Sequence, residues 1–377
     1  MKDMVIFVNY DDGSKDLYSS YGKRSALHNY DDIYSDSGQR RNASSRYVKN
    51  NKSGKKTKKR RGQAIALTAV ILVCCILLSL GGLYLYAYRT IDKIEREPLN
   101  TADLGITSDK YDSVKNIALL GLDTRQDNDT GRSDAVVILT VDKKNKKIKL
   151  TSVARDTYVA IDGRGQDKLT HAYAYGKSQL AVKTLNENFG TEITDYVTFN
   201  FFGMSRVIDC IGGVTIDVTE KERVEMNSNI FPEMRSLGID CPDIENAGTQ
   251  VLNGGQAVCY ARIRHTDNDV QRGNRQKTVL TAMFAKVKKT NPVKLPKIAQ
   301  TVVSDCKTSL STNDIMNIGI WAVITSPEIE QLSIPNENVP SSGKMIKGVW
   351  YYVYDLNKAK DEIYNFITAE SSKEATK

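Results

Sequence analysis

The sequence predicts an α/β protein: a single domain with a central mixed β-sheet, preceded by one membrane-spanning helix and a polar tail. Three observations predict this arrangement. Residues 64–88 contain no charged side chain, which suits the hydrocarbon core of a bilayer. Strand-like and helix-like segments alternate from about residue 113 onward, and no second linker interrupts them. Such alternation is typical of one α/β domain.

The excess positive charge of the chain lies before the apolar segment. The net charge is +8, and residues 1–88 contain 15 basic and 7 acidic side chains, so the remainder is neutral. Much of the excess lies in Lys49–Arg61, directly before the apolar run. Such a basic cluster predicts a cytoplasmic N-terminus that contacts anionic lipid head groups, and an extracytoplasmic C-terminal part. Nucleic-acid binding is the less direct interpretation.

Composition and pattern divide the chain into five segments. We predict a disordered basic cytoplasmic tail over 1–61, a transmembrane helix over 62–88 and a juxtamembrane spacer over 89–112. The main α/β domain is predicted over 113–290. A C-terminal α/β extension over 291–377 is predicted to pack on the same domain. The protein is thus expected in the cell membrane as a single-pass protein.

The predicted strands and helices follow from hydrophobic periodicity. The predicted strands are Asn116–Gly121, Ala135–Val141, Lys146–Ser152, Tyr196–Phe201, Val214–Val218, Ala257–Ile263, Ile329–Ile334 and Val349–Val353. The second and third of them are joined by Asp142–Asn145 and form a predicted hairpin. Helices are predicted over Ala172–Phe189 and Arg275–Lys288, with two more in the extension.

The six cysteines fall into three kinds of surroundings. Cys74 and Cys75 lie in the apolar run, while Cys210 and Cys259 lie in strand-like apolar segments, where a buried thiol is expected. Cys241 and Cys306 lie in polar segments on the predicted oxidising side. A disulfide between these two and a pair of free thiols are both open, because spacing does not determine connectivity.

Two carboxylates lie between the first two predicted strands. Asp123 follows the first predicted strand in the segment GLDTR, and Asp134 precedes the next in GRSD, two residues after Arg132. Paired carboxylates on neighbouring loops suit a hard cation such as Mg²⁺, which binds through one or two carboxylates together with phosphate oxygens and water. Loop caps and surface ion pairs are the alternative, and these residues alone favour it.

Clustered arginines favour a phosphate site over loop caps and surface ion pairs. Arg155 ends the third predicted strand, and Arg262 and Arg264 lie two apart on a predicted strand, so both would leave the same face. Guanidinium groups match phosphate oxygens in bidentate fashion. The sequence therefore predicts a phosphate or diphosphate site facing two metal-binding carboxylates. His171 is interpreted as a structural hydrogen-bonding residue.

These segments, in this order, resemble the LytR-CpsA-Psr family of Gram-positive cell-wall enzymes. The segments are NIALLGLDTR, GRSDAVVILTVD, KIKLTSVARDTYV, KLTHAYAYG, RVIDCIGGV and LNGGQAVCYARIRHTDNDVQRGNRQ. The resemblance covers about residues 113–290. It implies an α/β/α fold with an apolar pocket for a polyprenyl chain. It also implies transfer of a glycopolymer (teichoic acid, capsule or secondary wall polysaccharide) from a polyprenyl diphosphate carrier to a muramic acid hydroxyl of peptidoglycan.

The resemblance also implies roles for particular residues. Asp123 and Asp134 would bind Mg²⁺, or Mn²⁺ in its place. The diphosphate would contact Arg132, Arg155, Arg262, Arg264, Arg272 and Gln276. Asp269, or alternatively Asp267, would help to deprotonate the acceptor. Arg155, Arg262, Arg264 and Asp269 would thus be the catalytic residues, and a phosphodiester and polyprenyl phosphate would be the products.

Two further functions stay open from the sequence. A polyprenyl-diphosphate diphosphatase would use the same site with water as the acceptor. A non-catalytic binder or regulator of cell-wall synthesis, such as a transcriptional attenuator, is the other alternative. A neutral domain without a helix-turn-helix pattern, on the predicted far side of the membrane from DNA, does not favour the attenuator.

Overall fold

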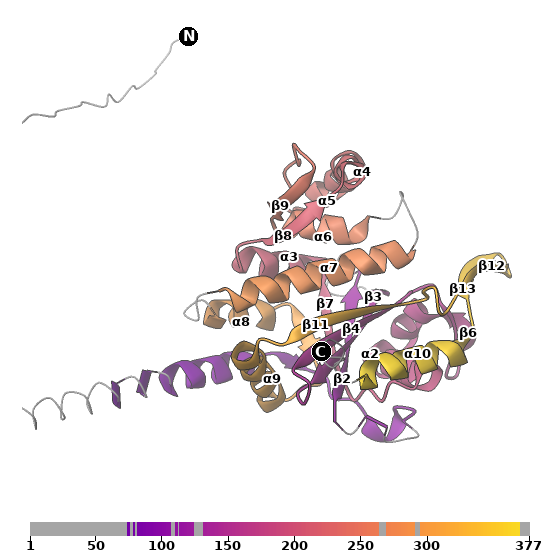
Figure 1. Ribbon diagram of the computed structural model, residues 1–377, viewed down its shortest axis with the longest axis horizontal. Helices are drawn as coiled ribbons and strands as arrows, with labels where there is room; N and C mark the ends of the chain where they lie inside the picture. Colours follow the sequence, from indigo (N-terminus) through magenta and orange to yellow (C-terminus); the bar gives the residue numbers. More distant parts are fainter. Residues whose placement is uncertain are drawn as a thin grey trace, which may run out of the picture. The chain divides into compact units, whose positions relative to one another are not determined.

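The computed structural model of the protein describes residues 74–75, 78–79, 81–106, 110–111, 113–123, 131–263, 269–290 and 295–369 (Figure 1). The predicted tail and most of the predicted span lie outside these residues. Among the helices that the structure describes, none is both long enough and apolar enough to cross a membrane.

A seven-stranded mixed sheet forms the centre of the domain. Its strand order is β1-β10-β7-β2-β3-β4-β11. The strands are β1 (Glu95–Arg96), β2 (Lys115–Leu122), β3 (Ser133–Asp142), β4 (Lys147–Val153), β7 (Asp195–Asn200), β10 (Cys306–Thr308) and β11 (Glu328–Ile334). β3 pairs antiparallel with β2 and β4, whereas β2 pairs parallel with β7 and β4 parallel with β11. The predicted α/β domain with a mixed sheet is confirmed.

Helices cover both faces of this sheet. On one face, Ala118 and Leu120 of β2 pack in a core with residues of α2 (Leu169–Phe189) and α10 (Leu356–Thr368). On the other face, Ile117 and Leu119 pack in a core that includes residues of α7 (Asp269–Lys288) and α9 (Thr312–Thr325). Successive side chains of a strand point to opposite faces, which explains this division. The domain therefore has three layers, and α2 and α7 lie on opposite sides of the sheet (Figure 1).

Further short helices pack against the outer side of α7 around a separate apolar core. They are α3 (Phe201–Cys210), α4 (Glu220–Glu225), the π-helical turn η2 (Met226–Ile230), α5 (Phe231–Ser236), α6 (Gly254–Arg262) and α8 (Leu295–Val303). The two-stranded sheet of β8 (Val214–Val218) and β9 (Gly248–Leu252) completes this core.

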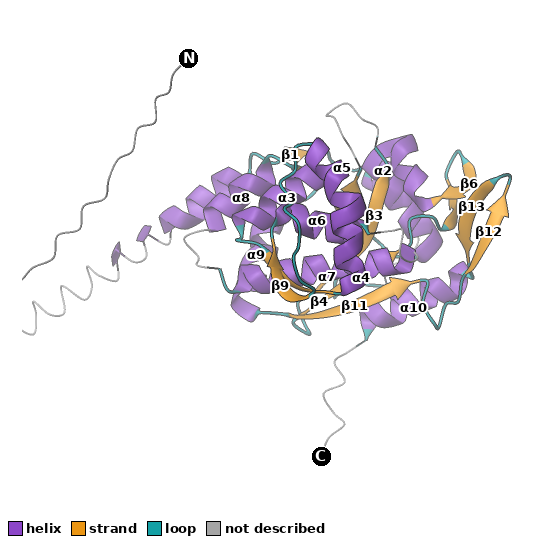
Figure 2. Ribbon diagram, turned by 90° about the horizontal axis from the view of Figure 1, so that it is seen from above, coloured by secondary structure: helices purple, strands orange, loops and turns teal. Residues whose placement is uncertain are grey.

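Two small hairpins pack at the far end of the domain. They are β5–β6 (Tyr158–Ile161 and Gly165–Lys168) and β12–β13 (Ser342–Ile346 and Val349–Val353). They lie side by side in both views (Figures 1 and 2), and Thr157 forms a bridge with Tyr352. A single-turn 3-10 helix, η1 (Thr101–Asp103), precedes β2.

The predicted strand Ala257–Ile263 is wrong, because this segment is helix α6. Asn253 and Gln256 form a capping box at its start, in which each side chain binds the other residue's backbone N–H. A Cβ on Gly254 would lie 1.9 Å from the Ser205 carbonyl oxygen, so only glycine permits this approach of α6 to α3. The helix is buried from Gly254 to Tyr260, and burial on all sides removes the helical periodicity from the sequence.

The C-terminal extension also differs from the prediction. It contains three described helices, α8, α9 and α10, rather than two. Its strands β10 and β11 join the central sheet, beside β7 and β4 respectively.

Cys241 and Cys306 are free thiols in the structure. Cys241 is buried next to Cys259, and their contact lowers the pKa of the Cys241 thiol and raises that of Cys259. Burial raises the pKa of Cys306, at the start of β10, to about 12. The disulfide alternative for Cys241 and Cys306 is therefore not realised, and Cys259 is buried as expected.

Lys149 fixes α10 against the sheet, and its removal is expected to destabilise the fold. Its side chain is 0% exposed, and its Nζ donates to the carbonyl oxygens of Phe366 (3.0 Å), Ile367 (2.7 Å) and Ala369 (2.9 Å). These groups end α10, where a cation is favoured. Leaving them buried without a donor should make Lys149→Met less stable by about 2 kcal/mol or more.

Urea unfolding of the wild type and of Lys149→Met measures this effect. Lys143→Met, at an exposed turn position of the neighbouring hairpin, makes the same change and should leave the unfolding free energy nearly unchanged. Equal stability of Lys149→Met and the wild type would contradict the assigned role.

Candidate active site

The end of β2 and the start of β3 place the two predicted carboxylates at one edge of the sheet. Asp123 directly follows β2, and its backbone N–H donates to the Arg132 carbonyl oxygen at 3.2 Å. Gly121 pairs with Ala135 and Leu122 with Ser133, so Asp134 is an additional residue in β3 at a β-bulge. Bulges re-aim side chains and are common beside active sites.

Arg155 links the end of β4 to the bulge. Its Nη1 lies 2.5 Å from Asp134 Oδ2, and its Nε lies 3.6 Å from Asp156 Oδ2. The arginine is buried, so its charge is little screened by water. The structure thus places two predicted site residues, Asp134 and Arg155, in direct contact.

Asp156 is a site residue that the sequence did not reveal. Burial alone would raise its pKa, but a 2.7 Å hydrogen bond from Lys168 Nζ and the charges of Arg155 and Arg272 outweigh burial and hold the pKa below its ordinary value. Asp156 is therefore ionised at neutral pH and fixes three cations around it. Lys168 occurs in the segment KLTHAY, but only the fold shows that it reaches this loop.

Helix α7 supplies Arg272 and Gln276. A Cβ on Gly273 would lie 2.5 Å from Ser152 Oγ, so the glycine lets the first turns of α7 approach the end of β4. Arg272 is buried, while Gln276 lines a small cavity described below. The neighbouring Arg275 is structural: its Nε pairs with Glu222 at 2.7 Å, and its Nη1 donates to the Ile263 carbonyl oxygen.

Arg262 is not brought into this cluster. Arg262 ends α6, where its guanidinium lies 4.7 Å from the centre of the Phe201 ring and 3.6 Å from Glu233. Its predicted position on a strand is wrong, as is the shared strand face with Arg264. Arg264 and Asp267 lie outside the described residues, and the side chain of Asp269 is not described either. Arg132 is exposed just before β3.

A small apolar cavity of about 50 Å³ starts beside the cluster. Gly121, Ala135 and Val137 line it from the sheet, and Gln276, Val279 and Leu280 line it from α7. Phe201, the partner of the Arg262 guanidinium, lines it as well.

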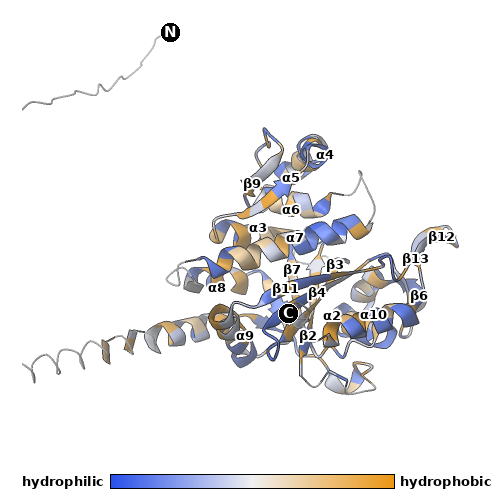
Figure 3. Ribbon diagram, viewed as in Figure 1, coloured by the Kyte–Doolittle hydropathy of each residue, from blue (hydrophilic) through white to orange (hydrophobic). Residues whose placement is uncertain are grey.

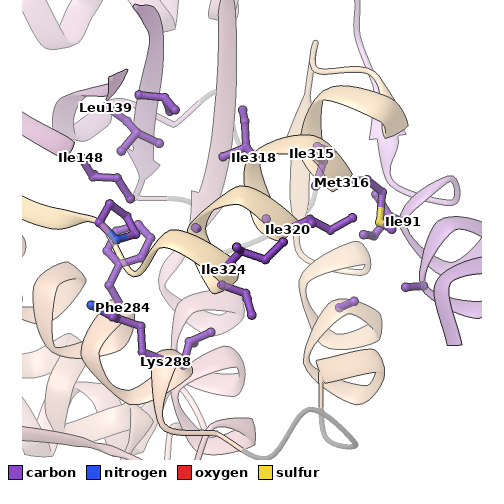
Figure 4. Close-up of a pocket in the computed structure, with 18 of the residues that line it drawn as sticks. Ile91, Leu139, Ile148, Phe284, Lys288, Ile315, Met316, Ile318, Ile320 and Ile324 are labelled. Carbon is purple, nitrogen blue, oxygen red and sulfur yellow. The ribbon is translucent and has the colours of Figure 1, made fainter. Parts of the chain in front are cut away.

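A larger cavity of about 510 Å³ follows along the same groove between the sheet and α7. The next inward positions of β3, Leu139 and Val141, line it together with Phe284 of α7. Residues 315–324 of α9 form much of the opposite wall (Figure 4), and α9 is mainly apolar (Figure 3). The helical segment 81–91 contributes Leu83, Tyr84, Ala87 and Ile91. Lys288 is the one charged residue among the described residues that line this cavity.

Comparison with known proteins places this geometry in context. The model of the LytR_cpsA_psr family matches residues 82–366. The chain belongs to this family. It is 29% identical over 330 residues to a polyisoprenyl-teichoic acid–peptidoglycan teichoic acid transferase, TagT, of Bacillus subtilis (strain 168), covering 83% of this chain and 98% of TagT. It is 31% identical over 287 residues to a TagU transferase of Enterococcus faecalis, covering 74% of this chain and 85% of that protein.

Solved structures of LytR_cpsA_psr proteins have the same fold. A structure of TagT bound to LI-WTA has a TM-score of 0.58 and 29% identity, and it covers 72% of this chain and 100% of that one. A TagT structure with bound octaprenyl pyrophosphate lipid has a TM-score of 0.54 and 27% identity, with the same coverage. The relatives with these names are transferases, and an enzymatic role is supported for this LytR_cpsA_psr protein too.

The donor set of this LytR_cpsA_psr site suits a hard divalent cation that shares its coordination with substrate. Asp123 and Asp134 supply carboxylate oxygens, the ligands that Mg²⁺ prefers. No group of three or more His, Cys, Asp and Glu side chains that could hold a metal occurs among the described residues. Two carboxylates therefore fit an ion whose other ligands are phosphate oxygens and water.

Lys277, one turn after Gly273 on α7, is expected to make stability depend on pH. Burial lowers its pKa to about 8 from 10.5, and its Nζ donates to the Leu332 carbonyl oxygen at 2.9 Å. Between these two pKa values the unfolded chain binds more protons than the folded one, so the unfolding free energy rises with pH through this window. The gain should be at most about 3 kcal/mol.

Urea unfolding of the wild type and Lys277→Met at about pH 7.5 and about pH 10 tests this expectation. The difference in unfolding free energy should shift in favour of the wild type at the higher pH, because methionine does not titrate. A difference that is independent of pH would contradict the assignment.

Proposed function

We propose that the protein is a phosphotransferase that moves an anionic glycopolymer from a polyprenyl diphosphate carrier to a muramic acid hydroxyl of peptidoglycan. The products are a phosphodiester and polyprenyl phosphate. Teichoic acid, capsule and secondary wall polysaccharide are the candidate polymers. The observation that carries the proposal is a buried cationic cluster at the mouth of an apolar groove.

The charges around the cluster support a diphosphate ligand. Arg155, Lys168 and Arg272 gather around the buried carboxylate Asp156. Forked guanidinium groups match the oxygens of a diphosphate bound beside them. Further proposed diphosphate contacts are Arg132, Arg262, Arg264 and Gln276. Arg262 lies next to Phe201, which lines the small cavity.

The apolar groove supports a prenyl tail. The small and large cavities follow one another along β3 and α7, from the cationic cluster toward the segment 81–91. A prenyl chain bound there would remove its apolar surface from water, at about 25 cal/mol per Å². The relative with bound octaprenyl pyrophosphate supports this ligand class.

Catalysis would consist mainly of neutralising and positioning the diphosphate. A diphosphate repels an incoming hydroxyl, and fixed cations reduce that repulsion at the attacked phosphorus. Arg155 is proposed to stabilise charge on the phosphate oxygens, since its partner Asp134 holds it in place. Asp123 and Asp134 would hold Mg²⁺, or Mn²⁺, which supplies further charge neutralisation of the diphosphate when bound. The family resemblance suggests Asp269 or Asp267 as the carboxylate that helps to deprotonate the acceptor hydroxyl.

The proposed location is the cell membrane, with residues 62–88 as the span and the α/β domain on the outer side. The basic run Lys49–Arg61 supports a cytoplasmic N-terminus. The segment 81–91 lines the large cavity, so the groove opens near the predicted end of the span.

The deciding experiment is turnover by the purified full-length protein in lipid nanodiscs. A polyprenyl-diphosphate oligosaccharide is supplied with and without muramyl glycan chains, and products are identified by mass spectrometry. The proposal expects a phosphodiester-linked adduct. Release of free oligosaccharide phosphate without any adduct would indicate a diphosphatase instead. Binding of the donor without turnover would indicate a binder.

A further inference from the structure

A hydrogen-bonded His–Asp pair lies next to the proposed diphosphate site. His171 Nδ1 lies 2.8 Å from Asp167 Oδ2. The same carboxylate accepts hydrogen bonds from the hydroxyls of Tyr175 (2.7 Å) and Tyr351 (3.3 Å). Burial alone would raise the pKa of Asp167, but the bonds from Tyr175 and His171 hold it below the ordinary value. The carboxylate is therefore ionised and rigidly held.

The pair is attached to the loop that carries Arg155. The Thr170 N–H, one residue before His171, donates to the Arg155 carbonyl oxygen at 3.0 Å. Lys168, one residue after Asp167, pairs with Asp156. The pKa of Tyr175 is raised mainly by its bond to Asp167, while the charges of Arg164 and Arg132 oppose the shift. The His–Asp pair thus lies close both to the loop that carries Arg155 and to Arg132.

The pair also belongs to the face of the sheet opposite the apolar groove. Its use by an acceptor rests on the proposed function. Attacking and leaving oxygens lie roughly in line across the transferred phosphorus. The leaving polyprenyl phosphate is tied to the groove on the α7 face of the sheet. The acceptor hydroxyl must then approach the phosphorus from the side away from the leaving oxygen, and α2, which carries His171, packs on the face of the sheet away from the groove.

One imidazole nitrogen remains available for the acceptor. An ionised carboxylate only accepts hydrogen bonds, so the neutral imidazole carries its hydrogen on Nδ1 and its lone pair on Nε2. Nε2 makes no hydrogen bond with any residue that the structure describes, and the side chain is 19% exposed. An oriented imidazole with a free lone pair is the usual form of a general base.

We propose that His171, oriented by Asp167, is the general base that accepts the proton of the acceptor hydroxyl. The acceptor oxygen forms a bond to the sugar-linked phosphorus while the bond from that phosphorus to the bridging oxygen breaks. The electron pair of the broken bond leaves with polyprenyl phosphate. The proton moves to His171 Nε2 and is then released to water. This role goes beyond the structural interpretation of His171, and Asp269 or Asp267 stays the alternative base.

His171→Ala is expected to lower kcat for transfer about 10²-fold or more, the typical contribution of a positioned base. The affinity for the polyprenyl-diphosphate donor, measured by titration, should change little. Added imidazole should restore much of the lost rate, because a small base can occupy the space left by the side chain. A purely structural histidine would not give this rescue.

A matched variant controls for a general effect of losing a histidine. His28→Ala makes the same change in the predicted cytoplasmic tail and should have the wild-type rate. Transfer that survives in His171→Ala, or a loss that imidazole does not rescue, overturns the inference alone. Absence of transfer by the wild type overturns the proposed function and the inference together.

Discussion

Arg155→Ala is expected to slow glycopolymer transfer on the order of 10³-fold, the size seen for a charge-stabilising arginine in phosphoryl transfer. Arg155 is buried, contacts Asp134 directly and lies 3.6 Å from Asp156. Its loss would remove one cation from the diphosphate site. It would also release Asp134, one of the two proposed metal-binding carboxylates. Initial rates with the polyprenyl-diphosphate donor and muramyl acceptor measure the effect.

Two matched variants make this prediction specific. Arg155→Lys keeps the charge but loses the planar fork, so it should recover only a small part of the rate. Arg206→Ala removes an arginine that pairs with Asp305 on the surface and should transfer at nearly the wild-type rate. Circular dichroism and thermal unfolding identify any loss of fold. A folded Arg155→Ala protein within about threefold of the wild-type rate would contradict the assigned site.

The sequence predicted the central strands because their residue pattern is simple. β2 and β3 are apolar over most of their length, and charged and apolar residues alternate at the start of β4, although β4 is buried throughout. Helix α6 was missed because the decisive features are a capping box and close backbone packing at Gly254. Neither leaves a periodic signal, and the alternation of Arg262 and Arg264 with Ala261 and Ile263 in the sequence favoured a strand.

Within the site, the sequence located the residues that flank strands and missed those that depend on tertiary contacts. Asp134 and Arg155 could be predicted to meet because strand ends on one edge of a sheet lie close together. The pair of Asp156 and Lys168 needs the turn of β5–β6 to bring α2 back to the loop. The bond from Tyr351 to Asp167 spans 184 residues, and no local pattern encodes such a contact.

Gly319→Trp is expected to select against long prenyl chains. Gly319 lines the large cavity from α9, and a Cβ there meets no atom within 4 Å, so an indole ring can enter the cavity without a clash at its base. Burial of hydrocarbon contributes about 0.8 kcal/mol per CH₂, so exclusion of even part of one prenyl unit should raise KM for an undecaprenyl donor about tenfold or more. A farnesyl donor, whose tail ends nearer the cationic cluster, should keep its wild-type KM.

Asn317→Trp adds the same ring at an exposed position of α9 outside the lining residues and should alter neither KM. The short donor reports on the diphosphate site alone. An equal rise in KM for both donors would therefore point to general damage of the site. An unchanged KM for the long donor would show that the prenyl chain does not occupy this cavity.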